Sequence, residues 1–257
     1  MRESELQVLR GIAFLAALGL AVLLQRLAPH ARLRGSWSVN GGLWLVSTGV
    51  VGAVCGGCAF TAARWAAHDG LGLLNRINAG AWVAFPSTIV FLDLVSYGWH
   101  RANHRVPLLW RLHQVHHSDP TFTVSTGLRF HPGELLLSLP VRLAAVVLLG
   151  APVAAVLVFE IAFTVANLVE HGDINVRRDI EHALGRLLVT PALHRRHHTK
   201  VDPRRGTNFG TIFSAWDRLF GTYTPNDSAT RIETGLGGVS AVALRRALWL
   251  PLERAAG

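Results

Sequence analysis

Long apolar runs dominate the first two-thirds of this 257-residue chain and constrain its fold more than any other feature. Residues 11–24 and 41–63 are predicted to cross a bilayer as helices, and a third run covers residues 79–97 with Asp93 inside it. Buried helices of a large soluble protein are a poorer interpretation, because too little polar sequence remains to cover them. The runs therefore predict an all-α integral membrane protein.

The longest apolar run, residues 135–168, exceeds the length of a single membrane crossing. Residues 150–152 (Gly-Ala-Pro) divide it, so it is expected to form a hairpin of two short membrane helices. The first run lacks the small-residue cleavage site of a signal peptide and is expected to stay in the protein. The expected total is four to five membrane helices.

Three histidine clusters accompany the membrane runs. The pattern HxxxH covers residues 100–104, and HxxHH occurs twice, at residues 113–117 and 194–198. On a helix, residues three and four apart share one face, so each cluster directs two or three imidazoles to one side. Eight or nine clustered histidines exceed the four ligands that a zinc ion usually takes. The clusters therefore predict a site for two metal ions.

The chemistry of the cluster favours iron. Soluble di-iron proteins bind their metals through Glu-x-x-His pairs, and this sequence holds none. Two iron ions are the expected cofactor of such a histidine-rich membrane site, with zinc as the alternative, because imidazole binds both. A membrane metal transporter or metal sensor is the non-enzymatic alternative. Against transport, no run of polar residues crosses the bilayer.

The chain is strongly basic, with a formal net charge of +9. In a soluble protein this charge would suggest nucleic acid, but beside membrane helices contact with anionic lipid headgroups explains it better, and no nucleic-acid partner is expected. Arg26, Arg32 and Arg34 lie in the first loop, and further arginines lie in residues 101–111. The positive-inside rule places both segments and all the histidine clusters on the cytoplasmic side, in a bacterial inner membrane.

Several motifs extend the pattern beyond histidine. They are residues 129–134 (RFHPGE), 170–174 (EHGDI), 190–194 (TPALH), 208–210 (NFG) and 216–223 (WDRLFGTY). Together with the clusters, they make residues 93–223 resemble the fatty acid hydroxylase and sterol desaturase superfamily of membrane-bound, non-haem di-iron oxygenases. One departure is Asp173, where members of the superfamily usually carry asparagine.

The resemblance implies an enzyme that uses O2 to hydroxylate a fatty-acyl or sterol-like lipid. Its electrons would come from an external cytochrome b5-like or ferredoxin-like protein. A desaturase or an ether-lipid-cleaving oxygenase of the same superfamily is the alternative within enzymes, because the histidine clusters are common to all of them. The resemblance also adds His171 to the clusters, so the expected metal ligands are His100, His104, His113, His116, His117, His171, His194, His197 and His198.

Other polar residues are candidates for supporting roles. Asp93 lies two turns before His100 and is expected to hydrogen-bond a ligand imidazole or an arginine, or else to make a polar contact near the interface. Asn167 and His131 are candidates for contact with the metals, directly or through water, and His131 could instead orient a helix. Glu160 lies in mid-helix and is expected to face the protein interior.

The remaining candidates are expected to be structural. Asp217 and Arg218 would fix the C-terminal fold over the site. Cys55 and Cys58 form a CxxC inside an apolar run, where small residues that permit close helix packing are a plainer explanation than a redox or zinc role. The histidines outside the clusters, His30, His68 and His182, are expected on the surface or in loops.

The expected organisation has three parts. Residues 1–84 would form N-terminal membrane helices, and residues 85–225 the di-iron catalytic domain. Residues 226–257 would form a tail, in which residues 239–254 are predicted to be an interfacial amphipathic helix.

Overall fold

The structure is a computed structural model that describes residues 2–200, 206–225, 232–237 and 243–253. These residues form helices joined by loops, with isolated bridges but no strand among them. Among the same residues, five helical segments are long and apolar enough to cross a membrane: Glu3–Leu27, Trp37–Arg76, Ala81–Arg105, Pro132–Leu149 and Val153–Glu170. The structure confirms the predicted all-α membrane fold.

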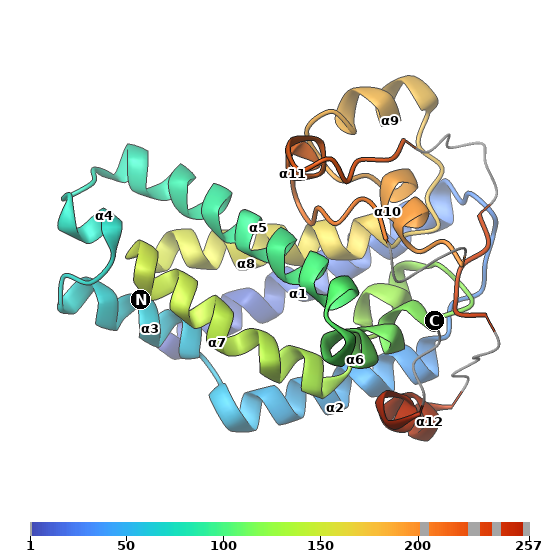
Figure 1. The fold of residues 1–257 in the computed structure, drawn as a ribbon, viewed down its shortest axis with the longest axis horizontal. Helices are drawn as coiled ribbons and strands as arrows, with labels where there is room; N and C mark the ends of the chain where they lie inside the picture. Colours follow the sequence, from blue (N-terminus) through green and yellow to red (C-terminus); the bar gives the residue numbers. More distant parts are fainter. Residues whose placement is uncertain (1, 201–205, 226–231, 238–242, 254–257) are drawn as a thin grey trace.

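The long helices lie along the long axis of the molecule (Figure 1). They are α1 (Glu3–Leu27), α2 (Trp37–Cys55), α5 (Ala81–Arg105), α7 (Pro132–Leu149) and α8 (Val153–Glu170). Helix α1 packs on α8, and α5 packs on both α7 and α8. The short helix α4 (Leu73–Arg76) lies at the end of the bundle away from the histidine clusters, which we call the far end (Figure 1).

Shorter elements form a cap at the opposite end of the bundle (Figure 1). They are α6 (Pro107–His117), η1 (Val124–Leu128), α9 (Arg178–Leu184), α10 (Pro191–His197) and α11 (Ala215–Leu219). The first loop reaches the same end, because the His30 amide donates to the Asp173 carbonyl oxygen. The two arginine-rich segments are therefore on one side of the bundle, as the expected topology requires.

The predicted helical hairpin is confirmed. Helix α7 ends at Leu149 and α8 begins at Val153, and Gly150 between them has a φ of 74° in the left-handed region. A Cβ at Gly150 would lie 2.8 Å from the carbonyl oxygen of Leu71. Both the conformation and the close approach of the loop before α4 therefore require glycine at this turn.

The apolar run at residues 41–63 is not one continuous helix, and this corrects the prediction. Helix α2 ends at Cys55, α3 (Cys58–His68) begins three residues later, and Gly57 between them has a φ of 82° that interrupts the helix. A disulfide joins Cys55 to Cys58 across this break. The two cysteines therefore connect α2 to α3 covalently, and are more than small residues that permit close packing.

The outward faces of the long helices are apolar. Ile12, Leu15 and Leu23 on α1 are each more than half exposed, and so are Val83 on α5 and Leu148 on α7. A large exposed apolar surface is unfavourable in water but suits the hydrocarbon of a bilayer.

The C-terminal helix is shorter than expected in the part that the structure describes. Residues 239–242 and 254 of the predicted interfacial helix lie outside the described residues. The described part forms α12 (Leu244–Trp249) and η2 (Leu250–Leu252). Ala247 and Leu250 pack against Leu43 of α2, whereas Trp249 is exposed.

Candidate metal centre

Histidines from distant parts of the chain converge where the cap meets the bundle. They form two groups, and within each group one ligand atom from every residue lies within 4.8 Å of the others. All nine side chains are buried. The five-histidine group is His100, His104, His113, His117 and His197, and the four-histidine group is His116, His171, His194 and His198. Together the two groups contain all nine residues expected to be metal ligands.

The local structure aims these side chains at one another. His100 and His104 lie one turn apart at the end of α5, and Pro107 at the start of α6 allows the chain to turn back against α5. Helices α6 and α10 carry the two HxxHH boxes, and His171 caps the end of α8. Each box is divided between the groups, so the two sites share both helices.

Backbone carbonyls fix the orientation of several imidazoles. A carbonyl oxygen accepts a hydrogen bond and cannot donate one, so a ring nitrogen that contacts it carries the proton. The Nδ1 atoms donate at 2.6–3.2 Å, from His171 to Asn167, from His197 to Thr207, from His100 to Phe209 and from His116 to Arg129. The Nε2 atoms of these four rings therefore carry lone pairs, which is the form that binds a metal.

These lone pairs converge. The Nε2 atom of His171 lies 3.0 Å from Nε2 of His116 and 3.0 Å from Nε2 of His194. Among the described residues, the buried Nε2 atoms of His100 and His197 have no hydrogen-bond partner. The lone pairs of His171 and His116 face each other without a proton between them and need a cation to bring them together, so the donor set fits metal ions.

Aromatic rings surround the histidines. His104 lies 5.1 Å from the Trp110 ring and 5.2 Å from the Phe209 ring, measured between centroids. The Phe122 ring lies 5.1 Å from His198. All three aromatic side chains are buried, so they exclude water from the cluster on these sides.

Two buried glutamates accompany the groups. Glu134 on α7 accepts hydrogen bonds from His113 Nδ1 at 2.8 Å and from Asn103 at 3.1 Å. Glu170, at the end of α8, has one carboxylate oxygen 3.8 Å from Nε2 of His194, and its other oxygen has no hydrogen-bond partner among the described residues. Both glutamates lie in motifs of the sequence that carried no assigned role for them; the adjoining RxHPG and His171 were the available signals.

Asp93 holds the cap against α5. Its carboxylate accepts hydrogen bonds from the Thr211 hydroxyl, the Trp216 indole and the amides of Ile212 and Phe213, at 2.7–3.1 Å. None of these four donors is an imidazole or an arginine. Asp93 therefore holds the segment that follows Phe209, whose carbonyl oxygen accepts the hydrogen bond from His100.

Asp217 has a parallel structural role. Its carboxylate accepts hydrogen bonds from the amides of Phe209 and Gly210 and from the hydroxyl of Thr222. Burial raises its pKa, while these hydrogen bonds act in the opposite direction. Arg218 donates to the Gly185 carbonyl oxygen, and together the two residues fasten the end of the cap.

The other candidates lie beside the groups. Asn167 donates from its side chain to the Gly127 carbonyl oxygen at 2.8 Å, and its own carbonyl accepts from His171. His131 lies in neither metal-binding group; it accepts a hydrogen bond from the Gly133 amide and so caps α7. Asp173 accepts from the amides of Ala31 and Leu33, which attaches the first loop to the cap.

The histidines outside the clusters also lie outside both groups. His30 is 3.8 Å from the Asp173 carboxylate, His68 contacts Asp69 on the surface, and His182 is exposed on α9.

Burial keeps the clustered histidines neutral. Removing an imidazolium from water is costly, so burial lowers the pKa of His171 to about 4. Burial, and then repulsion from neighbouring imidazoles, holds the pKa values of His116 and His194 well below the ordinary 6.5. Neutral imidazole is the form that binds a metal, so the site is ready to bind one at neutral pH.

The fold and this cluster define a class: helical membrane proteins with a buried polyhistidine cluster that could hold metal ions. The sequence profile of the family named fatty acid hydroxylase matches residues 85–222, which is more than half of the chain. The chain belongs to the fatty acid hydroxylase family.

Characterised relatives are lipid-modifying enzymes. Over 95% of its length the chain is 28% identical to the ornithine lipid hydroxylase OlsE of Rhizobium tropici, and the alignment covers 75% of that protein. It is 33% identical to the alkylglycerol monooxygenase of Danio rerio over 56% of the chain, and 28% identical to that of Homo sapiens over 53%. Each of these two alignments spans 30% of the relative. No solved structure matches the chain. These relatives support an oxidoreductase that acts on lipids.

Proposed function

We propose that this protein is a membrane-bound, non-haem di-iron oxygenase that hydroxylates a lipid, with the nine clustered histidines as its metal ligands. The observation that supports this proposal most directly is the convergence of buried, neutral imidazoles into two adjacent groups at the end of an apolar helix bundle. Two ions are proposed because nine ligands exceed the needs of one.

Bound iron would supply the chemistry that the side chains lack, namely the reduction of O2 and the oxidation of a C–H bond. The protein supplies the setting. Backbone carbonyls orient the rings, Glu134 orients His113, and the aromatic side chains exclude water. The apolar faces of α1, α5 and α7 give a lipid chain access from the bilayer.

The relatives suggest a polar membrane lipid as the substrate. The full-length likeness to an ornithine lipid hydroxylase favours hydroxylation of a lipid of that general kind. The higher identity to an alkylglycerol monooxygenase over half the chain favours ether-lipid cleavage as the second candidate. Desaturation shares the same histidine boxes and is distinguished by its product.

We place the histidine end of the bundle in the cytoplasm, in a bacterial inner membrane. Both arginine-rich segments lie at this end, and the positive-inside rule then sets the orientation. Arg105 and Arg111 are exposed there. A basic surface beside the metal centre suits an acidic electron-donor protein.

Turnover under 18O2 tests the proposal. The purified chain, loaded with ferrous iron in nanodiscs, is given a reductant and a total polar lipid extract, and His104→Ala serves as the inactive control. Hydroxylation predicts a lipid product that carries one 18O atom. Desaturation predicts loss of two hydrogens without label, and ether cleavage predicts a shortened lipid. An unchanged lipid pool together with metal flux across vesicles would overturn the proposal in favour of transport.

A further inference from the structure

Two arginines and one glutamate meet inside the helix bundle, away from the histidines. Glu160 on α8 is buried, and its carboxylate lies 3.0 Å from Arg10 of α1 and 3.7 Å from Arg142 of α7. Both arginine side chains are 43% exposed. Three membrane-spanning segments therefore each contribute one charge to a single cluster, which we call the Arg-Glu-Arg cluster.

The cluster lies at one depth. Arg10 is seven residues from the start of α1, Glu160 is seven from the start of α8, and Arg142 is seven from the end of α7. At 1.5 Å per residue, each lies about 10 Å from the far end of its helix. Charged groups so far inside membrane helices are rare and mark functional sites unless they are fully paired.

The pairing is incomplete. Two positive charges meet one negative charge, which leaves a net charge of +1. Among the described residues, Glu160 is the one carboxylate that pairs with either arginine. The guanidinium of Arg142 makes no hydrogen bond within those residues; its contacts are the 3.7 Å ion pair and the Phe163 ring at 6.0 Å. Several N–H groups of Arg142 therefore have no acceptor among the described residues, and one further negative charge would neutralise the cluster.

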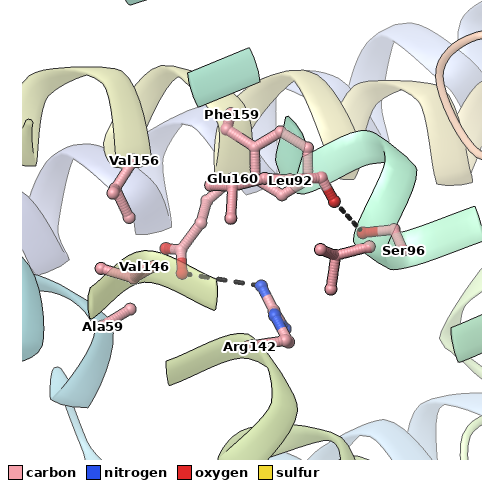
Figure 2. A pocket seen from close by; sticks show the side chains of 9 residues that line it. Ala59, Leu92, Ser96, Arg142, Val146, Val156, Phe159 and Glu160 are labelled. Atoms are coloured by element: carbon pink, nitrogen blue, oxygen red, sulfur yellow. Dashed lines mark hydrogen bonds and ion pairs between the residues drawn. The ribbon is translucent and has the colours of Figure 1, made fainter. Parts of the chain in front are cut away.

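A partly open pocket adjoins Arg142 and Glu160 (Figure 2). Its walls come from α3, α5, α7 and α8 and are mainly apolar, with Leu92, Val146 and Phe159 among them. Ser96 adds a hydroxyl that donates to the Leu92 carbonyl oxygen and keeps its lone pairs (Figure 2). The free volume is about 20 Å3, enough for one water-sized group. A carboxylate is a smaller anion than a phosphate headgroup, so it suits this opening better.

We propose that the Arg-Glu-Arg cluster is a binding site for the carboxylate of an acyl lipid, with Arg142 as the residue that binds it. A monoanion cancels the excess charge and accepts hydrogen bonds from the free donors of Arg142. Because the pocket is partly open, the hydrocarbon chain would extend out of it past the apolar walls.

The position of this site gives it a consequence for catalysis, which rests on the proposed function. Glu160 precedes Glu170 by ten residues on α8, a distance of about 15 Å along the helix. A chain that ran along α8 from a carboxylate bound at Arg142 would reach the histidines with a carbon at that fixed distance. The cluster would thereby determine which carbon is oxidised.

Equilibrium binding of radiolabelled palmitate tests the site, with hexadecanol as the neutral match. The iron-loaded full chain in nanodiscs is compared with Arg142→Gln, Arg142→Lys and the exposed control Arg76→Gln. Palmitate binding is expected to weaken about tenfold or more in Arg142→Gln, because this variant loses hydrogen bonds between charged groups. Arg142→Lys keeps the positive charge and should largely keep palmitate binding. Hexadecanol binding and the control should be unchanged. Equal palmitate binding by Arg142→Gln and the unchanged chain would overturn the proposal.

Two further measurements test the site independently of palmitate binding by Arg142→Gln. A palmitate analogue with a diazirine next to the carboxylate should label the peptides that contain Leu92 and Phe159 in the unchanged chain, and labelling elsewhere would contradict the site even if Arg142→Gln failed to fold.

Phosphatidic acid is compared with diacylglycerol, and dependence on Arg142 for phosphatidic acid alone would also contradict a carboxylate site. None of these assays needs turnover. Carboxylate binding without oxygenation of any lipid would refute the proposed function but support this site. Oxygenation of a lipid without carboxylate binding at Arg142 would refute this site but support the proposed function.

Discussion

The five-histidine group draws its side chains from α5, α6 and α10, whereas the four-histidine group replaces the α5 pair with His171 from the end of α8. A carboxylate accompanies each group in a different way. Glu134 is engaged by His113 and Asn103, while Glu170 lies near His194 with one oxygen unpartnered among the described residues. Backbone carbonyls orient imidazoles in both groups, but within the described part of the chain only in the first does the carboxylate also accept a hydrogen bond from one of the group's histidines. The four-histidine group has one histidine fewer, and an oxygen of the nearby Glu170 carboxylate has no hydrogen-bond partner among the described residues.

Removal of one ligand from either group is expected to have the largest effect. His104→Ala should lose the metal of the five-histidine group, and His171→Ala that of the four-histidine group, so each variant should keep about one iron per chain. Both should lose lipid oxidation, because the proposed chemistry needs two ions. Metal analysis and product assay measure this, with the exposed His182→Ala as the control. Loss of both irons in either variant would mean that the groups are one site.

Substitution of the two glutamates should sharpen the comparison. Glu134→Gln removes the charge that His113 faces, and loss of such a partner typically weakens metal binding by about 10–100-fold. The weakening should appear in the five-histidine group alone. Glu170→Gln should instead weaken the four-histidine group. A cobalt titration that resolves two binding steps would separate them, and identical effects of both variants on both steps would remove the distinction between the groups.

Asp93→Asn should act on the cap that the five-histidine group needs. It weakens four hydrogen bonds donated by residues 211–216, and the free energy of unfolding should fall by about 1–3 kcal/mol because the Asp93 side chain that accepts them is buried. His100 donates to the carbonyl of nearby Phe209, so its group should lose metal first. Thermal unfolding and metal retention measure this against the exposed control Asp69→Asn. A variant as stable as the unchanged chain would deny Asp93 this role.

A pH dependence is also expected in the metal-free protein. The pKa of His171 is about 4 in the folded chain and about 6.5 when unfolded, so the unfolded chain binds more protons between these values. The free energy of unfolding should therefore be at its full value above pH 6.5 and fall as the pH drops toward 4. Denaturant unfolding at several pH values measures this. His171→Asn should flatten the slope, and an unaltered slope would show that His171 does not contribute to it.

The spacing of the histidines predicted the two HxxHH boxes as faces of helices, because residues three and four apart always meet on a helix. The division of each box between two groups was beyond prediction, since it depends on how α6 and α10 approach each other. The role of Asp93 was missed for a similar reason, because Thr211, one of its partners, lies 118 residues away. The break at Gly57 could have been predicted from the paired glycines at residues 56–57.

The apolar runs predicted the number of membrane helices and the hairpin, because bilayer thickness fixes the length of a crossing. They gave no sign of the Arg-Glu-Arg cluster. Glu160 was expected to face inward, but Arg10 lies 150 residues from it and pairs with it through the packing of α1 on α8. Such pairings arise from tertiary structure, and local patterns do not encode them.

The number of irons per chain tests the central claim most directly. The purified protein is reconstituted anaerobically with 57Fe(II), the bound metal is counted, and Mössbauer spectra are recorded. Two groups that differ in ligands predict close to two irons per chain in two distinguishable environments. A single iron per chain with full lipid oxidation would contradict the account.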